Sequence, residues 1–458
     1  MTPFVKKVIG SNGFALVGAG LVPARNRPTM TGAAIGIDVG TSGVRAALVD
    51  AAGAPLAVGS ALLAPAQRRD PASWWRAVEA ALRALRAAAD LSAVRGIAVD
   101  GTSGTILMLD DAGRPVGEAN LYNDPAPETA VRAVVAVAPA GSAARGAASP
   151  LAKLLAMQDM PGTARLAHQA DWIAARLGAP LGISDENNAL KTGYDPVLRS
   201  WPGWLRDLGI RFALLPEVVE PGTPVGTIDP ALAARFGLPA DAVVAAGTTD
   251  GCAAFLATGA DAVGEAVTSL GSTLTLKQLC DGPIFSPEHG VYSHRLGGRW
   301  LAGGASNSGG AALARHFSPD ALAALSARIN PLMESGLDYY PLPGPGERFP
   351  FADAHLPPRE TSRPADDAHF LHGLLEGIAR IEALGYRRLA KLGGPALVSI
   401  RTVGGGARNA AWTAIRSRAL GVELLPAKSE EAAVGAAVLA IAATRKAVSA
   451  GRRTEVAG

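Results

Sequence analysis

The first regular pattern in the chain is a pair of apolar runs on either side of a short turn. In "IGIDVGTSGVRAALVD", residues 35–50, apolar side chains dominate both runs, and Gly-Thr-Ser-Gly at 40–43 separates them. Short apolar runs joined by a glycine-containing loop are typical of a β-hairpin. The pattern therefore predicts a hairpin with one carboxylate, Asp38, at the mouth of its turn.

The next pattern has helical spacing. Asp70 is a suitable N-cap and Pro71 a suitable first residue, and apolar residues then recur every three or four positions, at Trp74, Val78, Leu82 and Leu85. Residues 94–116 return to a strand, a Gly-Thr-Ser-Gly turn, a strand and a second turn. Helical and strand patterns that alternate in this way predict an α/β fold.

Beyond the middle of the chain, the hairpin pattern recurs. The Pro/Gly-rich passage 220–229 could connect two domains, and the apolar run after it ends at Gly247, before a helix expected to begin near Asp250. In "AVTSLGSTLTLKQL", residues 266–279, apolar runs again flank a small-residue turn. We interpret the two hairpins as a duplicated fold facing one cleft, with chance recurrence as the alternative because such units are common.

Composition narrows the class of protein. A chain of 458 residues, 48% hydrophobic, exceeds what one core usually organises, so two domains are expected. The net charge of +3, without a basic block, indicates no nucleic-acid or membrane-surface partner. Only Cys252 and Cys280 are present, which fits a reducing compartment and excludes a four-cysteine zinc site. Residues 1–29 resemble a secretory signal sequence only weakly. We expect this N-terminal extension to be a disordered tail or the result of an upstream start. We expect no membrane span, and a cytoplasmic enzyme.

Several common catalytic motifs are absent from the sequence. No lysine follows a glycine, so there is no P-loop, and the glycines near Gly18 and Gly404 break the dinucleotide fingerprint. Neither His-Glu-x-x-His nor Gly-x-Ser-x-Gly occurs. What remains are glycine-and-hydroxyl turns, whose backbone N–H groups can cradle phosphate oxygens. A carboxylate beside a phosphate-binding turn requires a cation that offsets its negative charge. Asp38 is therefore a candidate for binding Mg²⁺ through a bridging water. A purely structural hairpin is the alternative for any one turn.

Taken in order, several motifs resemble the FGGY family of carbohydrate kinases. They are "AIGIDVGTSGVRAALVD", "LYNDPAP", "ISDENNALKTGYDPVLRSWP", "TPVGTIDPALAARFGLP", "VVAAGTTDGCAAF", "SLGSTLTL" and "TVGGGARNAAW", which together span Ala33 to about Ala443. The resemblance implies two actin-like, ribonuclease-H-like α/β domains around a central cleft, which we place at 30–243 and 244–450. It also implies phosphorylation of a sugar hydroxyl with ATP and Mg²⁺.

The resemblance also implies site residues. Asp38 matches a position close to both metal and sugar, and Asp250, in "GTTDG", falls on the catalytic base position. A carboxylate there would take the proton of the attacking hydroxyl, and a place at a helix start would favour its ionised form. An ordinary N-cap is the alternative for Asp250. The expected phosphate-binding residues are Gly40, Thr41, Ser42, Gly271, Ser272 and Thr273, and the expected nucleotide-binding residues are Gly309, Gly404, Gly405, Gly406 and Asn409.

The expected partner is a small-molecule sugar. Xylulose- and glycerol-type members of the family carry a Gly-Gln-x-His-Gly-like stretch, and this chain has the turn 99–105 in its place. That turn is similar to the one in the ribulose-kinase branch and in short plant and cyanobacterial members of the family. Ser103 and Asp124 are therefore candidates for contacts with sugar hydroxyls, and D-ribulose is the leading substrate. D-xylulose, and an actin-like ATPase or a non-catalytic sugar sensor, stay open as alternatives. The oligomeric state also stays open, with a homodimer among the options.

Overall fold

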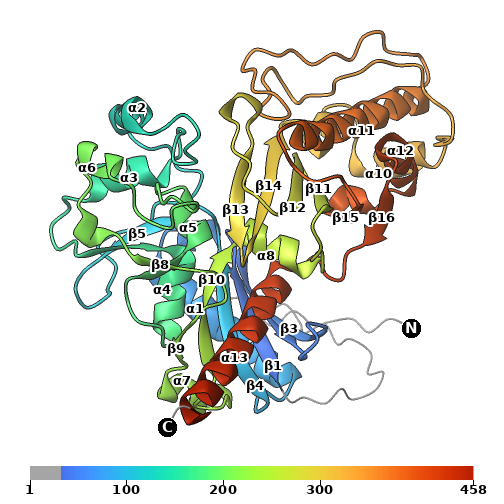
Figure 1. Ribbon diagram of the computed structural model, residues 1–458. Coiled ribbons are helices and arrows are strands. Elements are labelled where there is room, and N and C mark those ends of the chain that lie inside the picture. The colour runs from blue at the N-terminus through green and yellow to red at the C-terminus, as the bar shows by residue number, and fades with distance from the viewer. Residues whose placement is uncertain (1–31, 457–458) are drawn as a thin grey trace. The chain divides into compact units, whose positions relative to one another are not determined.

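The computed structural model describes residues 32–456, so the predicted extension 1–29 lies outside the described residues. The chain divides into two compact units. The first contains the residues up to Ala257 and those from Glu431 onward, and the second is Thr258–Glu430. Each unit is built on one six-stranded sheet (Figure 1).

The sheet of the first unit is mixed, with the strand order β3-β2-β1-β4-β10-β9. The predicted first hairpin is confirmed, since β1 is antiparallel to β2, and β1 is parallel to β4, which is parallel to β10. The bounds are β1 (Ala33–Val39), β2 (Gly43–Val49), β3 (Pro55–Leu62), β4 (Val94–Gly101), β9 (Pro224–Thr227) and β10 (Val243–Thr249).

Helices cover both faces of this sheet. On one face lies the predicted helix α1 (Pro71–Ala88), whose N-cap Asp70 accepts the N–H groups of Ala72 and Ser73, together with α4 (Gln169–Leu177). On the other lie α8 (Asp250–Ala257) and the long helix α13 (Ala432–Val456), which crosses the sheet in Figure 1.

The face that packs on α13 is made of very small residues. Ala34, Ala98 and Ala437 are buried there, and a Cβ built at Gly36 of β1 would lie 1.8 Å from the carbonyl oxygen of Ala433. The sequence of β1 thus alternates large residues toward α1 with small residues toward α13. This close approach brings α13 and α8 onto the same face as Asp38.

The rest of the first unit forms a smaller layer with its own apolar cluster. It contains two two-stranded sheets, β5 with β6 and β7 with β8. The bounds are β5 (Ile106–Leu109), α2 (Glu128–Val137), α3 (Pro150–Met157), β6 (Arg165–His168), β7 (Ile183–Asp185), α5 (Glu186–Leu190), α6 (Trp204–Asp207) and β8 (Glu217–Val219). Helix α7 (Pro230–Phe236) packs instead with α1 in the main core of the unit.

The second unit repeats the plan of the first. Its sheet has the order β13-β14-β12-β11-β15-β16, in which β11 is antiparallel to β12 and parallel to β15, as β1 is to β2 and β4. The second hairpin is therefore confirmed, and so is the duplicated α/β plan. The bounds are β11 (Glu265–Leu270), β12 (Leu274–Cys280), β13 (Tyr292–Leu296), β14 (Arg299–Ser306), α9 (Gly310–Ala314), α10 (Pro319–Ser326), α11 (Asp367–Lys391), β15 (Ser399–Val403), α12 (Ala410–Leu420) and β16 (Glu423–Pro426).

The division between the units differs from the predicted boundary at 243/244. Strand β10 pairs with β4 of the first sheet, and α8, which follows it, packs against α13. Asp250 therefore belongs to the first unit, although the sequence placed it in the second domain. The Pro/Gly-rich passage that suggested a linker contains β9, an edge strand of the first sheet. Proline and glycine suit an edge strand because such a strand needs hydrogen bonds on one side only.

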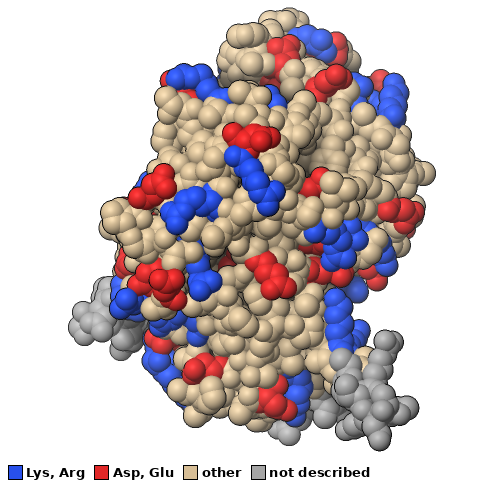
Figure 2. Space-filling view, turned by 60° about the vertical axis from the view of Figure 1, so that its left-hand side comes forward, with Lys and Arg blue, Asp and Glu red and all other residues tan. Residues whose placement is uncertain are grey.

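On the face drawn in Figure 2, Lys and Arg side chains lie among Asp and Glu side chains. Within the described residues, one stretch, Ala432–Ser449 of α13, has the length and hydropathy of a membrane span, although none was expected; 50% of it is buried. Its small apolar residues pack on the first sheet, which accounts for that composition.

Candidate active site

Carboxylates gather where neighbouring parallel strands of the first sheet end. Asp38 of β1 lies in register with Asp100 of β4, and Asp100 in turn lies in register with Thr248 of β10. Asp250 follows β10 directly, as the first residue of α8. The carboxyl ends of parallel strands form the usual ligand edge of an open α/β sheet. Asp38 and Asp250, which were predicted from separate motifs, therefore share one edge.

A bulge in β10 brings its end close to β4. The register between the two strands shifts between Ala245 and Thr248. At Gly247, in this bulge, an added Cβ would lie 1.8 Å from the carbonyl oxygen of Val99. Glycine is needed at this position because the backbone of β4 occupies the space of a side chain. Asp250 thus depends on Gly247 for its place.

Burial dominates the electrostatics of Asp38 and Asp100. Asp38 is 8% exposed and Asp100 is fully buried. Burial raises the pKa of Asp38 to about 6; a hydrogen bond from Asp100 opposes this rise, and the negative charge of Asp250 adds to it. Burial, then the charges of Asp38 and Asp250, raise the pKa of Asp100 well above its ordinary value.

The ionised form of Asp100 would lack hydrogen-bond donors. Among the described residues, no hydrogen-bond donor reaches either of its oxygens. When protonated, Asp100 can donate to Asp38, so the two groups form a carboxylic acid and carboxylate pair with one shared proton. This arrangement keeps the charge on Asp38, the member of the pair nearer to solvent.

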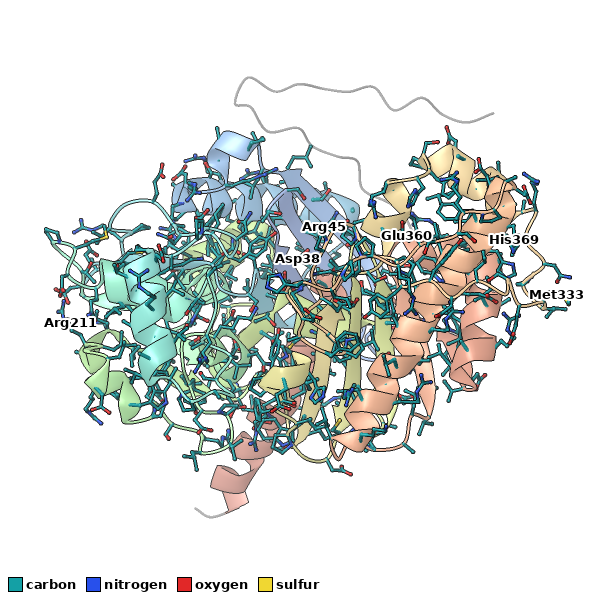
Figure 3. All side chains as sticks on the ribbon, turned by 90° about the horizontal axis from the view of Figure 1, so that it is seen from above. Asp38, Arg45, Arg211, Met333, Glu360 and His369 are labelled. Carbon is teal, nitrogen blue, oxygen red and sulfur yellow. The ribbon has the colours of Figure 1, made fainter. Side chains whose placement is uncertain are left out.

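Arg45 is the cation beside this pair. It lies opposite Asp38 on β2, and its Nη1 is 3.7 Å from Oδ2 of Asp38 (Figure 3). Its Nε lies 3.3 Å from Oε2 of Glu431. The side chain of Arg45 is 50% exposed, so solvent weakens its hold on Asp38. Sequence reasoning missed both Arg45 and Asp100.

Asp250 begins α8, as expected. Its Oδ1 accepts the backbone N–H of Gly251 at 2.6 Å, and the helix N-terminus favours negative charge there. The N-cap alternative is not what the structure shows, since Asp250 is the first residue of the helix itself. Its role as catalytic base stays a prediction.

The turn 40–43 is tight. The N–H of Gly40 donates to the carbonyl oxygen of Gly43 at 3.0 Å, and the carbonyl oxygen of Ser42 accepts from Leu63. Ser42 is exposed and Thr41 is half-buried. The predicted phosphate-binding residues of the first hairpin therefore lie in a partly exposed turn, two to four positions beyond Asp38.

Ser103 and Asp124, the candidate sugar contacts, lie in two turns that touch. The N–H of Tyr122 donates to Oγ1 of Thr105 at 3.0 Å, which joins the turn after β4 to the turn 121–124. The Asp124 carboxylate already accepts two hydrogen bonds from Arg69, both at 2.6 Å, and one from the N–H of Leu121. A sugar contact by Asp124 would add to these bonds, and it stays a prediction.

A buried lysine supports the same turn. Lys153 of α3 is 1% exposed, and its Nζ donates to the carbonyl oxygen of Leu121 at 2.5 Å. Burial lowers its pKa to about 8, partly offset by the charge of Asp124. Together with Arg69, Lys153 fixes both sides of the turn that carries Asp124.

The second unit holds a pocket of about 870 Å³ beside the second hairpin. Five of the predicted phosphate- and nucleotide-binding residues line it: Gly271, Ser272, Gly405, Gly406 and Asn409. Its remaining wall comes from α9, α10 and the start of α12. A volume between 300 and 1,000 Å³ is usual for a small-molecule site.

Three further predicted residues support this pocket without lining it. Thr273 completes the hairpin turn, where its carbonyl oxygen accepts the N–H of Gly271 at 3.2 Å. Gly309 has a φ of +130°, and a Cβ there would lie 2.8 Å from the carbonyl carbon of Thr273. Gly404 has a φ of +89°, and its Cβ would lie 2.9 Å from the oxygen of Leu270. These glycines let neighbouring chain segments close against the hairpin.

No ready-made metal cage appears among the described residues, since no three His, Cys, Asp or Glu side chains are grouped to hold an ion. Mg²⁺ usually binds through one or two carboxylates, water and substrate phosphates, so it needs no such cage. The carboxylate of Asp38, which keeps the charge of the pair and is the member nearer to solvent, fits that mode of binding.

Sequence profiles agree with the geometry. The N-terminal domain profile of the FGGY family of carbohydrate kinases matches residues 33–137, and its C-terminal domain profile matches residues 266–444. The chain belongs to the FGGY family. The two matched segments of this FGGY-family chain contain the two hairpins, one in each unit.

Individual relatives of this FGGY-family chain are distant. The xylulose kinase of Klebsiella pneumoniae is 27% identical over 290 residues, which cover 58% of this chain and 59% of that protein, so the match spans about three fifths of the relative. A Staphylococcus epidermidis xylulose kinase is 23% identical over 439 residues, which cover 89% and 87% of the two chains. A crystal structure named a "xyloylose kinase", from Brucella ovis, has a TM-score of 0.80 at 27% identity and covers 90% of this chain and 91% of its own. These likenesses confirm the predicted two-domain, actin-like α/β fold class.

Proposed function

We propose that this protein is an ATP-dependent pentulose kinase, which transfers the γ-phosphate of Mg-ATP to a hydroxyl group of the sugar. The observation that carries the proposal is the shared edge of Asp38, Asp100 and Asp250 in the first unit. An alcohol is a poor nucleophile, and a carboxylate within reach of its proton makes it a better one. Membership of the FGGY family supports the same class of reaction.

In the proposed reaction, Asp250 accepts the proton of the attacking hydroxyl as the bond to phosphorus forms. The α8 N-terminus favours the ionised form of Asp250, which is the form that a base requires. Bound Mg²⁺ would neutralise charge on the phosphates, and Asp38, with Asp100 beside it, would hold that ion through water. The turn residues Thr41 and Ser42, and Gly271 and Ser272, are the proposed phosphate contacts.

Two pentuloses fit, each favoured by a different observation. The turn Asp100-Gly101-Thr102-Ser103 favours D-ribulose through its likeness to the ribulose-kinase branch. The relatives from Klebsiella pneumoniae and Staphylococcus epidermidis are named xylulose kinases, which favours D-xylulose. Both sugars would meet Ser103 and the turn that carries Asp124. The terminal O5 is the proposed acceptor for either sugar.

A coupled assay of ADP release tests the proposal with D-ribulose, D-xylulose, ribitol and glycerol. We expect strong stimulation by one pentulose and little by the polyols. ATP hydrolysis that no sugar stimulates would identify an ATPase instead, and sugar binding without turnover would identify a sensor. Either result would overturn the kinase proposal.

A further inference from the structure

A run of polar residues to which the proposed reaction assigns no role is buried in the first unit. Residues 184–188, Ser-Asp-Glu-Asn-Asn, are each no more than 2% exposed. They lie in the motif "ISDENNALKTGYDPVLRSWP" and form the end of β7 and the first part of α5. Charged and amide side chains are rarely buried to this extent unless they hold a partner. The partners of this run therefore indicate its role.

The start of α5 is held by contacts within the run and by one ion pair. Asp185 caps the helix, since its Oδ1 accepts the N–H of Asn187 at 2.8 Å and that of Asn188 at 3.1 Å. The side-chain amide of Asn188 donates to the other oxygen of Asp185 at 2.6 Å. Glu186 lies 2.9 Å from Nε of Arg199. These contacts fix the backbone of α5, and with it the position from which the Asn187 side chain extends.

Asn187 reaches from this run to β10. Its Nδ2 donates to Oγ1 of Thr248 at 3.0 Å, and both residues are buried. Thr248 is in register with Asp100 of β4, so these two side chains lie on the same face of the sheet. Asp250 follows two residues after Thr248, as the first residue of α8. The amide of Asn187 therefore holds the chain directly before the proposed catalytic base.

The contact falls where β10 loses one of its neighbouring strands. The pairs that β10 makes with β9 end at Ala245, and the register between β10 and β4 shifts between Ala245 and Thr248. Beyond this shift, Thr248 and Thr249 pair with β4. A strand end that is paired along one edge only opens more easily than one held along both. The hydrogen bond from Asn187 adds a contact to β10 at this point.

We propose that Asn187 is a positioning residue for Asp250, which it holds in place by fixing Thr248 at the end of β10. The inference rests on the proposed kinase function and adds the residue that positions its base. A base must lie within hydrogen-bond reach of the proton that it accepts. A displacement of about 1 Å can lower the rate about a hundredfold. Because Asn187 acts through the backbone, its removal should cost less than replacement of Asp250 itself.

Turnover of the full chain tests the inference with a matched pair of substitutions. Asn187→Ala should lower kcat about tenfold or more, because the base is held less firmly. Asn188→Ala, the control, removes a buried amide from the same helix that bonds to Asp185 and not to β10. It should lower the free energy of unfolding in urea and leave kcat unchanged. Unchanged kcat in Asn187→Ala, or equal losses in the two variants, would overturn the inference.

Thr248→Val removes the other end of the hydrogen bond with little change in size. It should lower kcat as Asn187→Ala does. The double variant should lose no more than the more impaired single variant, because both substitutions remove one and the same bond. Losses of kcat that multiply in the double variant would overturn the inference, and so would normal turnover of Thr248→Val.

Hydrogen exchange tests the inference without any turnover. Amide hydrogens of residues 246–252 should exchange about tenfold faster in Asn187→Ala, because the end of β10 and the start of α8 lose a hydrogen bond that anchors them. In Asn188→Ala these amides should exchange as in the unsubstituted chain. Unchanged exchange in Asn187→Ala would overturn the inference. Faster exchange there, together with no pentulose-dependent turnover of the unsubstituted chain, would support the inference and refute the kinase proposal alone.

Discussion

Replacement of Asp100 by asparagine should make the protein more stable at neutral pH. Asp100 is fully buried, and no described donor reaches its carboxylate oxygens. Burial and the charges of Asp38 and Asp250 raise its pKa well above 3.8. Asparagine has nearly the same size, carries no charge, and can donate its amide hydrogen to Asp38 as the protonated acid does.

The sign and size of the effect follow from the raised pKa. The unfolded chain loses the Asp100 proton near pH 3.8, whereas the folded protein keeps it to higher pH. Between the unfolded-state pKa and the folded-state pKa of Asp100, the free energy of unfolding of the unsubstituted protein falls by about 1.4 kcal/mol per pH unit because of this carboxyl group. Asparagine lacks this loss, so its advantage should be small near pH 4 and should grow as the pH rises, by up to about 1.4 kcal/mol per pH unit for as long as folded Asp100 stays protonated.

Urea unfolding at pH 4, 5.5 and 7 measures the predicted difference. Asp111→Asn, at an exposed position, is the control, and its difference from the unsubstituted protein should not change with pH. A stability difference for Asp100→Asn that is flat with pH would show that burial does not hold the proton on Asp100. A fall in that difference as pH rises would refute the sign of the argument.

Three further substitutions test other parts of the structure. Asp250→Asn should lower kcat by roughly a hundredfold to ten-thousandfold while ATP still binds, and near-normal turnover in a steady-state assay would remove the base assignment; the exposed Asp241→Asn is its control. Gly36→Ala places a Cβ 1.8 Å from a carbonyl oxygen of α13, and should lower the free energy of unfolding, measured with urea, by about 1–3 kcal/mol. Gly298→Ala, where nothing lies within 4 Å of the added Cβ, is the control and should leave that free energy unchanged. Asp124→Asn weakens the paired bonds to its arginine partner, and should raise KM for the sugar more than KM for ATP; an equal rise in both would count against its place at the sugar.

The parts of the fold that were predicted correctly have local causes. The hairpin at 35–50 follows from two apolar runs and a glycine turn, and α1 from the N-cap Asp70 and apolar residues at helical spacing. The start of α8 at Asp250 was also predicted, because the apolar run before it ends in small residues. Each of these signals lies within about 20 residues of sequence, the range over which hydrophobic periodicity is informative.

The parts that were not predicted depend on pairing between distant segments. No local sequence pattern indicates that β10 pairs with β4, or that α13, at the end of the chain, packs on the first sheet. These two contacts place Asp250 in the first unit. Asp100 was missed for the same reason, since its partner Asp38 is fixed by the register of two strands. One signal was present: an apolar run ends near Gly-Thr-Ser-Gly both at Asp38 and at Asp100.

The two hairpins have the same topology and different chemistry, and this difference supports separate roles for the two units. Two positions before the turn, the first hairpin has Asp38, with Arg45 and Asp100 on the neighbouring strands. The second has Ser269 at the matching position, between Thr275 and Val403. A phosphate group is repelled by carboxylates but accepts hydrogen bonds from hydroxyl and backbone groups. A charged edge therefore suits the unit proposed to hold the metal and activate an alcohol, and an uncharged edge suits the unit whose pocket is proposed to hold the nucleotide.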